Sequence, residues 1–168
     1  MKSDRSWKTA RAGMLIAAIV ALSAAHGASA QDLERGKKLW EGKANCSFCH
    51  GWAGDGQGDP RSSGAGTSLR RATHMDWDAV YTIIQCGRPS TGMPYHDRFA
   101  YTDDRCFGLT SEDLGEATPP FSAHGLQRHE MEAVTDYVMA EIIGAGPVTR
   151  TDCVDFFGSE ADVCGTYD

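Results

Sequence analysis

The sequence predicts an all-α fold with three to five helices, and three observations support this class. Residues 32–45, 76–85 and 127–143 place apolar side chains at helical spacing. The segments between them are rich in Gly, Pro, Ser and acidic residues, which is typical of loops. A C-x-x-C-H run, Cys46-Ser47-Phe48-Cys49-His50, follows the first helical segment directly.

This run is the attachment signature of a c-type haem. Two thiols on one helical turn can each add to a vinyl group of the same porphyrin, and His50 then lies beneath the iron as an axial ligand. A structural zinc site usually needs a second cysteine pair, and the sequence has no second C-x-x-C. A thioredoxin-like motif should follow a strand, whereas a helix is expected before Cys46. The sequence therefore predicts one covalent haem c held by Cys46, Cys49 and His50.

Residues 1–30 have the pattern of a cleaved signal peptide. Four basic residues precede an apolar run at 14–25 that is too short to cross a bilayer comfortably, and Ala28-Ser29-Ala30 fits the small-residue cleavage pattern. Cleavage after Ala30 would leave Gln31 to Asp168 as an exported chain without a membrane span. The alternative is an uncleaved membrane anchor. We expect a bacterial periplasmic location, where haem c is attached covalently.

The charge of the expected mature chain limits its partners. Signal removal takes away four of the 16 basic residues and one of the 23 acidic ones, which leaves a formal charge of −10. Phosphate binding needs positive charge, so no nucleic-acid partner is expected. A redox protein with a basic docking face fits better, because opposite fields steer encounter.

Four cysteines remain after the C-x-x-C-H pair, and they allow three pairings. Disulfides are the default in an oxidising compartment. We expect Cys86 to pair with Cys106 and Cys153 with Cys164, although the residues alone leave the other pairings open. Residues 147–168 would then form a disulfide-closed extension that follows the main domain at 31–146.

The first helix is expected to be capped by Asp32 and to run to about Asn45. Gly36 is unfavourable inside a helix, so it suggests that another backbone or ring comes close. The Gly-rich segment at 51–67 has no G-K-[ST] run and therefore does not indicate a phosphate loop. We expect this segment to wrap the proximal side of the haem, with the Pro60 carbonyl accepting from the His50 ring N–H.

A short helix at 76–85 should lead into a loop that presents Met93 between Gly92 and Pro94. Most methionines fill cores, but Met93 lies on a loop that could cross to the other face of the haem. We predict Met93 as the sixth iron ligand. The rival donors are Met75, His74 and His96, while Met131 and Met139 are expected to pack on the last helix.

The stretch at 95–123 is long and irregular, so it should be functional or cross-linked. Its acids could in principle bind Ca²⁺, but no EF-hand pattern is present and a solvated acidic loop is the simpler interpretation. The last long helix should span 127–143 and stop before Gly144.

The order of these features resembles the class I cytochrome c family from Leu33 to about Gly144. The specific parts are C-S-F-C-H-G and G-R-P-S-T-G-M-P, and the second run is most similar to bacterial single-haem cytochromes found with periplasmic dehydrogenases and oxidases. The resemblance implies a class I cytochrome c fold around one covalent haem. The long 95–123 loop, Cys86 and the cysteine-bearing tail depart from the family pattern.

The resemblance also implies roles for individual residues. Cys46 and Cys49 would carry the thioethers, and His50 and Met93 would bind the iron. Pro60 is similar to the proline of the proximal loop, and Arg88 would contact a haem propionate. Three residues match the positions where the first and last helices cross in the family: Gly36, Trp40 and Tyr137.

The expected function is one-electron transfer between a redox enzyme, such as a dehydrogenase, and an acceptor, such as a terminal oxidase or another cytochrome. Two filled axial positions would leave no iron site for substrate. The first alternative is a haem enzyme or sensor in which Met93 is absent from the iron or easily displaced. The second is a fixed cytochrome subunit of a dehydrogenase or oxidase complex.

Overall fold

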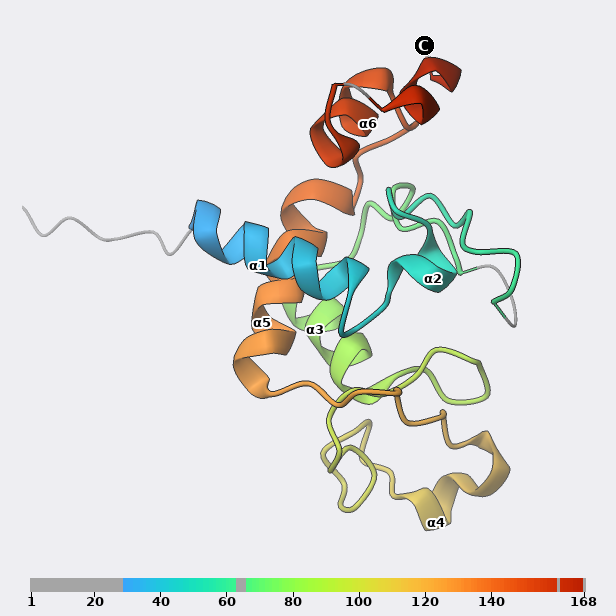
Figure 1. The fold of residues 1–168 in the computed structure, drawn as a ribbon. Coiled ribbons are helices and arrows are strands. Elements are labelled where there is room, and N and C mark those ends of the chain that lie inside the picture. The colour runs from blue at the N-terminus through green and yellow to red at the C-terminus, as the bar shows by residue number, and fades with distance from the viewer. Residues whose placement is uncertain (1–28, 63–65, 160, 168) are drawn as a thin grey trace, which may run out of the picture.

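The computed structural model describes residues 29–62, 66–159 and 161–167 (Figure 1). The predicted signal peptide therefore lies outside the described residues, apart from its last two positions. Within the described part the regular structure is helical, and no strand forms; one isolated bridge pairs Tyr95 with Phe121. The prediction of an all-α fold is confirmed.

The α-helices differ widely in length, and shorter 3₁₀ and π turns extend or connect them. In chain order the elements are α1 (Ala30–Glu41), α2 (Ser47–His50), α3 (Trp77–Cys86), α4 (Ser111–Leu114), the 3₁₀ turn η1 (Gly115–Ala117), α5 (Arg128–Tyr137), the π turn η2 (Val138–Ile142), α6 (Arg150–Phe157) and the 3₁₀ turn η3 (Asp162–Thr166).

Helix α1 begins and ends earlier than expected. Its N-cap is Ser29, whose side chain accepts from the Asp32 N–H, so the prediction of Asp32 as the cap was wrong. Asp32 lies instead in the first turn, where a carboxylate interacts favourably with the helix dipole. The helix stops at Glu41 because the Gly42 N–H closes the last turn on Lys38, and Asn45 has a left-handed φ of 53°.

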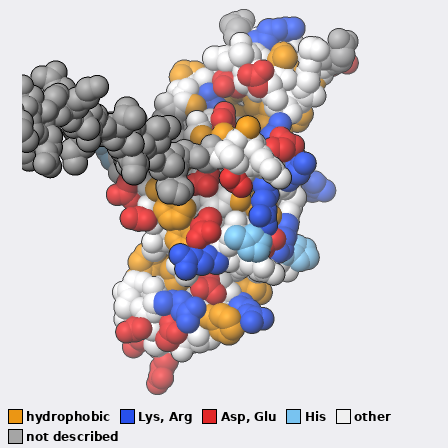
Figure 2. Space-filling view, turned by 90° about the vertical axis from the view of Figure 1, so that its left-hand side faces the viewer, with side chains coloured by type: hydrophobic (Ala, Val, Ile, Leu, Met, Phe, Trp, Pro, Cys, Tyr) orange, Lys and Arg blue, Asp and Glu red, His pale blue; other side chains and the backbone are white. Residues whose placement is uncertain are grey.

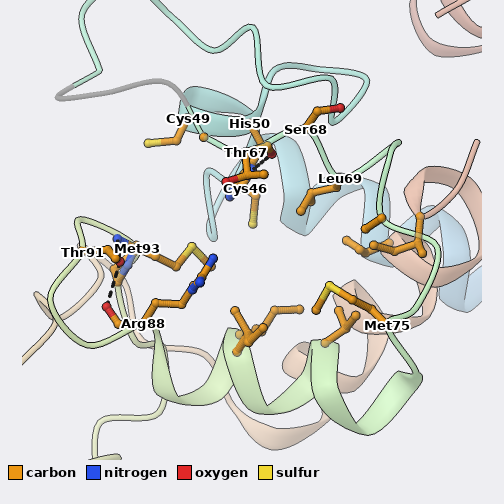
Figure 3. A pocket seen from close by; sticks show the side chains of 18 of the residues that line it. Cys46, Cys49, His50, Thr67, Ser68, Leu69, Met75, Arg88, Thr91 and Met93 are labelled. Atoms are coloured by element: carbon orange, nitrogen blue, oxygen red, sulfur yellow. Dashed lines mark hydrogen bonds between the residues drawn. The ribbon is translucent and has the colours of Figure 1, made fainter. Parts of the chain in front are cut away.

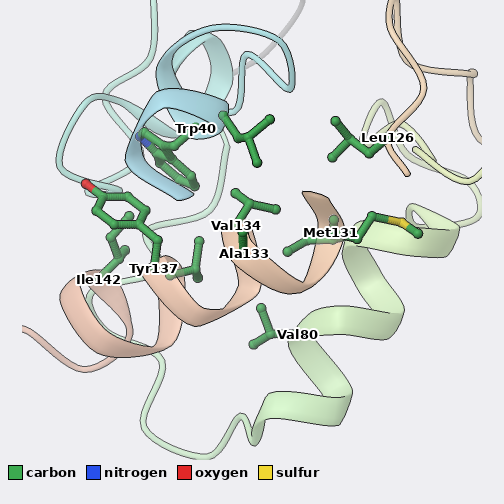
Figure 4. Close-up of a cluster of buried hydrophobic side chains, with 11 residues drawn as sticks. Trp40, Val80, Leu126, Met131, Ala133, Val134, Tyr137 and Ile142 are labelled. Atoms are coloured by element: carbon green, nitrogen blue, oxygen red, sulfur yellow. The ribbon is translucent and has the colours of Figure 1, made fainter. Parts of the chain in front are cut away.

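The core forms where α1 crosses α5 (Figure 4). Gly36 lies at the crossing, and a Cβ there would collide with the Ala133 carbonyl oxygen and with Tyr137. The Trp40 and Tyr137 rings pack with centroids 6.3 Å apart. The expectation that Gly36 permits close approach is thus confirmed. The buried cluster contains Leu39, Trp40, Val80, Ile84, Leu126, Met131, Ala133, Val134, Tyr137, Val138 and Ile142.

The two other long helical segments lie close to their expected positions. Asp76 caps α3, with its side chain accepting from the Ala79 N–H. Helix α5 starts after Gln127, and η2 continues it to Ile142, just before Gly144 adopts a left-handed φ of 72°. The sequence pattern predicted this last segment as one helix and did not indicate the π turn.

Two disulfide-closed additions flank this helical centre. We call residues 95–123 the arm; the Cys86–Cys106 disulfide ties it to the end of α3. We call residues 147–167 the tail; the Cys153–Cys164 disulfide closes it. Both expected pairings are confirmed. Figure 1 shows the arm, with α4, at one end of the molecule and the tail, with α6, at the other.

Candidate functional site

The C-x-x-C-H run forms a single tight turn. Cys46 is the N-cap of α2, and Cys49 and His50 occupy its end. The N–H groups of Cys49 and His50 both donate to the Cys46 carbonyl, at 3.2 and 2.9 Å. This turn places both thiols and the imidazole at the edge of one cavity (Figure 3).

The His50 ring is oriented by the loop that follows it, but not by the residue predicted. Its Nδ1 lies 3.0 Å from the carbonyl oxygen of Thr67. Pro60 lies on an exposed turn and does not line the cavity, so its prediction as the acceptor was wrong. The physical reason is the path of the loop, because the Gly66 N–H donates to the Cys49 carbonyl and draws Thr67 over the imidazole.

Gly66 is the sequence signal that could have indicated this arrangement. A Cβ at this position would lie 2.6 Å from His50 Nδ1 and 2.8 Å from the Cys49 carbonyl oxygen. A side chain therefore cannot be accommodated without moving the loop away from the imidazole. Thr67 itself contributes only a backbone carbonyl, which any residue could provide, so its type carries no information about this role.

Burial controls the protonation of the groups on this turn. Burial lowers the pKa of His50, and the hydrogen bond to Thr67 only partly offsets that effect. The imidazole is therefore neutral near pH 7, and Nδ1–H donation to Thr67 leaves the Nε2 lone pair free. Burial also raises the pKa of the Cys46 thiol to about 12.

Met93 is presented by a compact loop, which we call the Met93 loop and which comprises residues 87–94. Gly87 ends α3 with a left-handed φ of 64°, where a Cβ would collide with the Met93 carbonyl. The Arg88 N–H donates to that carbonyl at 3.2 Å, and the Thr91 hydroxyl donates to the Arg88 carbonyl at 2.8 Å. The loop thus turns back on itself, and both Met93 and Arg88 line the cavity.

The cavity has a volume of about 340 Å³ and a predominantly apolar wall. Figure 3 shows Cys46 and His50 at one side, and Met93 with Arg88 at another. Arg88 is the one charged side chain among the described residues that line it, with His50 neutral. Ten further apolar residues line the wall: Trp40, Leu69, Ala72, Met75, Val80, Ile83, Ile84, Pro94, Val138 and Ile143.

Of the rival iron donors predicted from the sequence, some line the cavity and others do not. His96 is buried elsewhere, with Nδ1 3.1 Å from the Ile84 carbonyl, and neither His96 nor His74 lines the cavity. Met75 does line it, but it also packs against the core cluster. Among the described residues, two thioethers therefore line the cavity, and of these two Met93 lies on a loop whose hydrogen bonds hold it there.

The loop after His50 is covered by the tail. The Trp52 ring contacts Phe156, Phe157 and Tyr167, with centroids 5.0, 5.1 and 5.9 Å away. On the inner side of this loop, the Trp52 carbonyl accepts from the Trp40 indole at 3.1 Å. The proximal loop is thus held between the core and the tail.

One comparison with known proteins covers the residues of this site. The family model described as cytochrome c oxidase, cbb3-type, subunit III, matches residues 31–109, which include the cysteine turn and the Met93 loop. The match indicates a c-type cytochrome family. The match is consistent with the class I, single-haem resemblance. A search of curated proteins found no match.

The chain also has a distant likeness to a solved structure. That structure is the reducing HAO-like protein complex of Kuenenia stuttgartiensis, with 22% sequence identity and a TM-score of 0.45. The alignment covers 68% of this chain and 45% of that chain. This likeness is too weak to support a functional conclusion.

The matching family implies haem c, and the residues around the cavity fit that group. The paired thiol turn, the neutral imidazole and the thioether supply the attachment points and the iron donors, while the apolar wall and the single guanidinium suit the porphyrin ring and its propionates. Among the described residues, no helix combines the length and the apolar character that a membrane span needs.

Proposed function

We propose that this chain is a periplasmic single-haem cytochrome that carries one electron between a redox enzyme, such as a dehydrogenase, and an acceptor, such as a terminal oxidase or another cytochrome. One observation carries the proposal: the cysteine turn and Met93, from two separate segments, face one apolar cavity. Protein donors for both axial positions favour electron transfer over chemistry at the iron.

Five side chains would hold the haem. Cys46 and Cys49 would carry the thioether bonds, and His50 would donate Nε2 to the iron. Met93 would donate its thioether from the loop after α3. Arg88, at the exposed rim of the cavity, would pair with a propionate.

When bound, the haem supplies a one-electron Fe(III)/Fe(II) couple, and the surrounding residues set its properties. Thr67 fixes the His50 ring and makes the imidazole a better donor. A thioether is a weak, soft donor that favours the reduced state, so Met93 would raise the potential relative to a second histidine. The apolar wall excludes water, which would also raise the reduction potential.

The proposed location is supported by the N-terminal sequence and by the disulfides. The N-terminal sequence has the features of a signal peptide. Two disulfides, Cys86–Cys106 and Cys153–Cys164, fit an oxidising compartment.

The charge distribution supports a partner with a basic docking face. Residues 31–94 carry seven acidic and eight basic side chains, whereas residues 95–168 carry 15 acidic and four basic ones. On the face seen in Figure 2, side chains of both signs are interspersed. The attractive field would therefore come from the acid-rich second half. We expect the rate of electron transfer to the partner to fall with ionic strength; a rate independent of salt would contradict electrostatic docking.

A fixed subunit of a larger complex is the second candidate. It is favoured by the matching family, whose name refers to a subunit of an oxidase. The electron-transfer chemistry would be the same, but the partner would be permanent. Purification of the native chain at moderate salt distinguishes the two: a free carrier elutes alone, whereas a subunit elutes with its complex.

The decisive test of the proposed chemistry is the optical spectrum of the purified holoprotein, oxidised and reduced, with and without carbon monoxide. We expect a weak near-infrared sulfur-to-iron band in the oxidised form and no carbon monoxide shift in the reduced form. Met93→Ala should lose the band, while Met75→Leu, the matched control, should keep it. A wild-type protein that lacks the band and binds carbon monoxide readily would support an enzyme or sensor.

A further inference from the structure

We propose that the arm is a positioning device that keeps the Met93 loop closed over the cavity, and that Cys86, Cys106 and Tyr101 are its positioning residues. This inference rests on the proposed function, in which Met93 is the second axial donor. It assigns the disulfide a role at the iron site in addition to its role in folding.

The arm has its own small core at the point where the Met93 loop begins. Cys86, Ala100 and Cys106 are fully buried there, and Tyr101 is nearly so. The Tyr101 hydroxyl donates to the Cys86 carbonyl at 2.6 Å. The last residue of α3 is therefore fixed to the arm twice, once by the disulfide and once by this hydrogen bond.

One backbone hydrogen bond joins the arm to the middle of the Met93 loop, because the Ser90 N–H donates to the Ala117 carbonyl at 2.8 Å. Two bonds within the arm fix Tyr95, the residue that follows the loop directly. The Tyr95 N–H donates to the Pro120 carbonyl at 3.0 Å, and the Tyr95 carbonyl accepts from the Ser122 N–H at 3.0 Å. The arm thus holds the residue before the loop, the middle of the loop and the residue after it.

Apart from its own internal hydrogen bonds, the loop has few other contacts with the described residues. Arg88, Ser90, Thr91 and Gly92 are exposed, and a Cβ at Gly92 would meet no atom within 4 Å. Ser90 also has a left-handed φ of 61°, which is unfavourable for a residue with a side chain. An exposed turn with such a residue opens readily unless its surroundings fix it. We infer that the arm sets the fraction of molecules in which Met93 remains at the iron.

The tail provides a matched control for this inference. Its disulfide also joins two fully buried cysteines that are close in sequence, Cys153 and Cys164. The tail, however, packs against Trp52 and lies at the other end of the molecule from the arm (Figure 1). Among the described residues, no hydrogen bond joins the tail to the Met93 loop. Loss of the tail disulfide should therefore leave Met93 ligation unchanged.

The test compares two double variants of the holoprotein, Cys86→Ala/Cys106→Ala and Cys153→Ala/Cys164→Ala. Alanine is used because a buried serine hydroxyl without a partner would add its own cost. The readouts are the sulfur-to-iron band and the rate of carbon monoxide binding to the reduced form. We expect the arm variant to bind carbon monoxide about tenfold faster, with a weaker band, because the open population rises. The tail variant should match the wild type.

Tyr101→Phe keeps the test decisive if the arm variant fails to fold. It removes only the hydroxyl that donates to Cys86, and we expect carbon monoxide binding to be about threefold faster. Unchanged binding in Tyr101→Phe, or equal changes in the arm and tail variants, would overturn the inference. Failure of the proposed function looks different, because the wild-type protein itself would then lack the band.

Discussion

The arm and the tail are both closed by one short-range disulfide, but they are joined to the haem cavity in different ways. The arm is bonded through backbone groups to the loop that carries Met93. The tail is attached through side chains, by aromatic contacts around Trp52 and by the buried guanidinium of Arg70. Two similar disulfides can therefore affect the iron site differently, because the arm is hydrogen-bonded to the Met93 loop and, among the described residues, the tail is not.

The Arg70 contacts show how the tail is tied down. The Arg70 guanidinium donates to the carbonyls of Ala145, Gly146 and Pro147 and forms an ion pair with Asp152 at 3.0 Å. These bonds fix the start of the tail to the residue that follows Leu69 in the cavity wall. They do not reach the His50 ring itself, whose partner is the Thr67 carbonyl.

The largest expected effect on stability comes from the disulfides. Their closed loops span 20 and 11 residues, so chain entropy predicts a loss of about 3 kcal/mol for either double cysteine-to-alanine variant. Chemical denaturation of both holoproteins measures this. Similar losses of stability combined with different carbon monoxide binding would show that the arm, and not the tail, is coupled to Met93. A tail variant that alone alters Met93 ligation would contradict this difference.

The next effect tests the attachment of the tail. Trp52→Ala removes a half-buried ring that contacts three aromatic residues, and we expect it to cost about 2 kcal/mol. Limited proteolysis should then cleave the tail faster, while the sulfur-to-iron band stays. Tyr95→Ala is the matched arm variant, because its ring contacts Tyr101 and Phe121, and it should weaken the band instead.

The helix caps give a smaller, paired test. Thr110 in the arm and Thr149 in the tail each form a capping box with an aspartate three residues later. Changing either threonine to alanine should cost about 1 kcal/mol, and changing it to serine should restore most of that loss. We expect Thr149→Ala to cost more, because it also disturbs Asp152, the partner of Arg70. Thermal unfolding of the four variants would detect the difference.

The smallest effect concerns acid pH. Burial would raise the pKa of Asp152, but hydrogen bonds from Thr149 and the charge of Arg70 outweigh burial, so the pKa lies below its ordinary value. The stability that this carboxylate contributes is present above about pH 4 and is lost as the pH falls through the lowered pKa. Proteolysis of the tail should therefore accelerate at acid pH. In Asp152→Asn it should be faster at neutral pH and depend less on acid; an identical pH profile would contradict this role.

The sequence predicted the parts of the fold that depend on local pattern. Apolar spacing located the long helices. A Cβ at Gly36 would collide with the neighbouring helix, which confirms why glycine is needed there. Both disulfide pairings were predicted because the paired cysteines are close along the chain. The helix start was misjudged because Ser29 and Asp32 are both good caps, and the residue types alone do not decide between them.

The parts of the site that depend on the path of a loop could not be predicted. Pro60 was expected to accept from His50, but the carbonyl of Thr67 does so, because the Gly66 N–H fixes the loop on Cys49. Any residue offers such a carbonyl. Met75 also lines the cavity together with Met93, a juxtaposition that follows only from the packing of α3.

We propose that Met93, held by the arm, is the second axial iron donor, with His50 of the cysteine turn as the first. The most direct measurement is the NMR spectrum of the reduced holoprotein with isotope-labelled methionine methyl groups. The expected mature chain has four methionines, and we expect one methyl signal to be shifted far upfield by the porphyrin ring current and to vanish in Met93→Leu. Four signals near their ordinary positions, or an upfield signal that survives in Met93→Leu and vanishes in Met75→Leu, would contradict the claim.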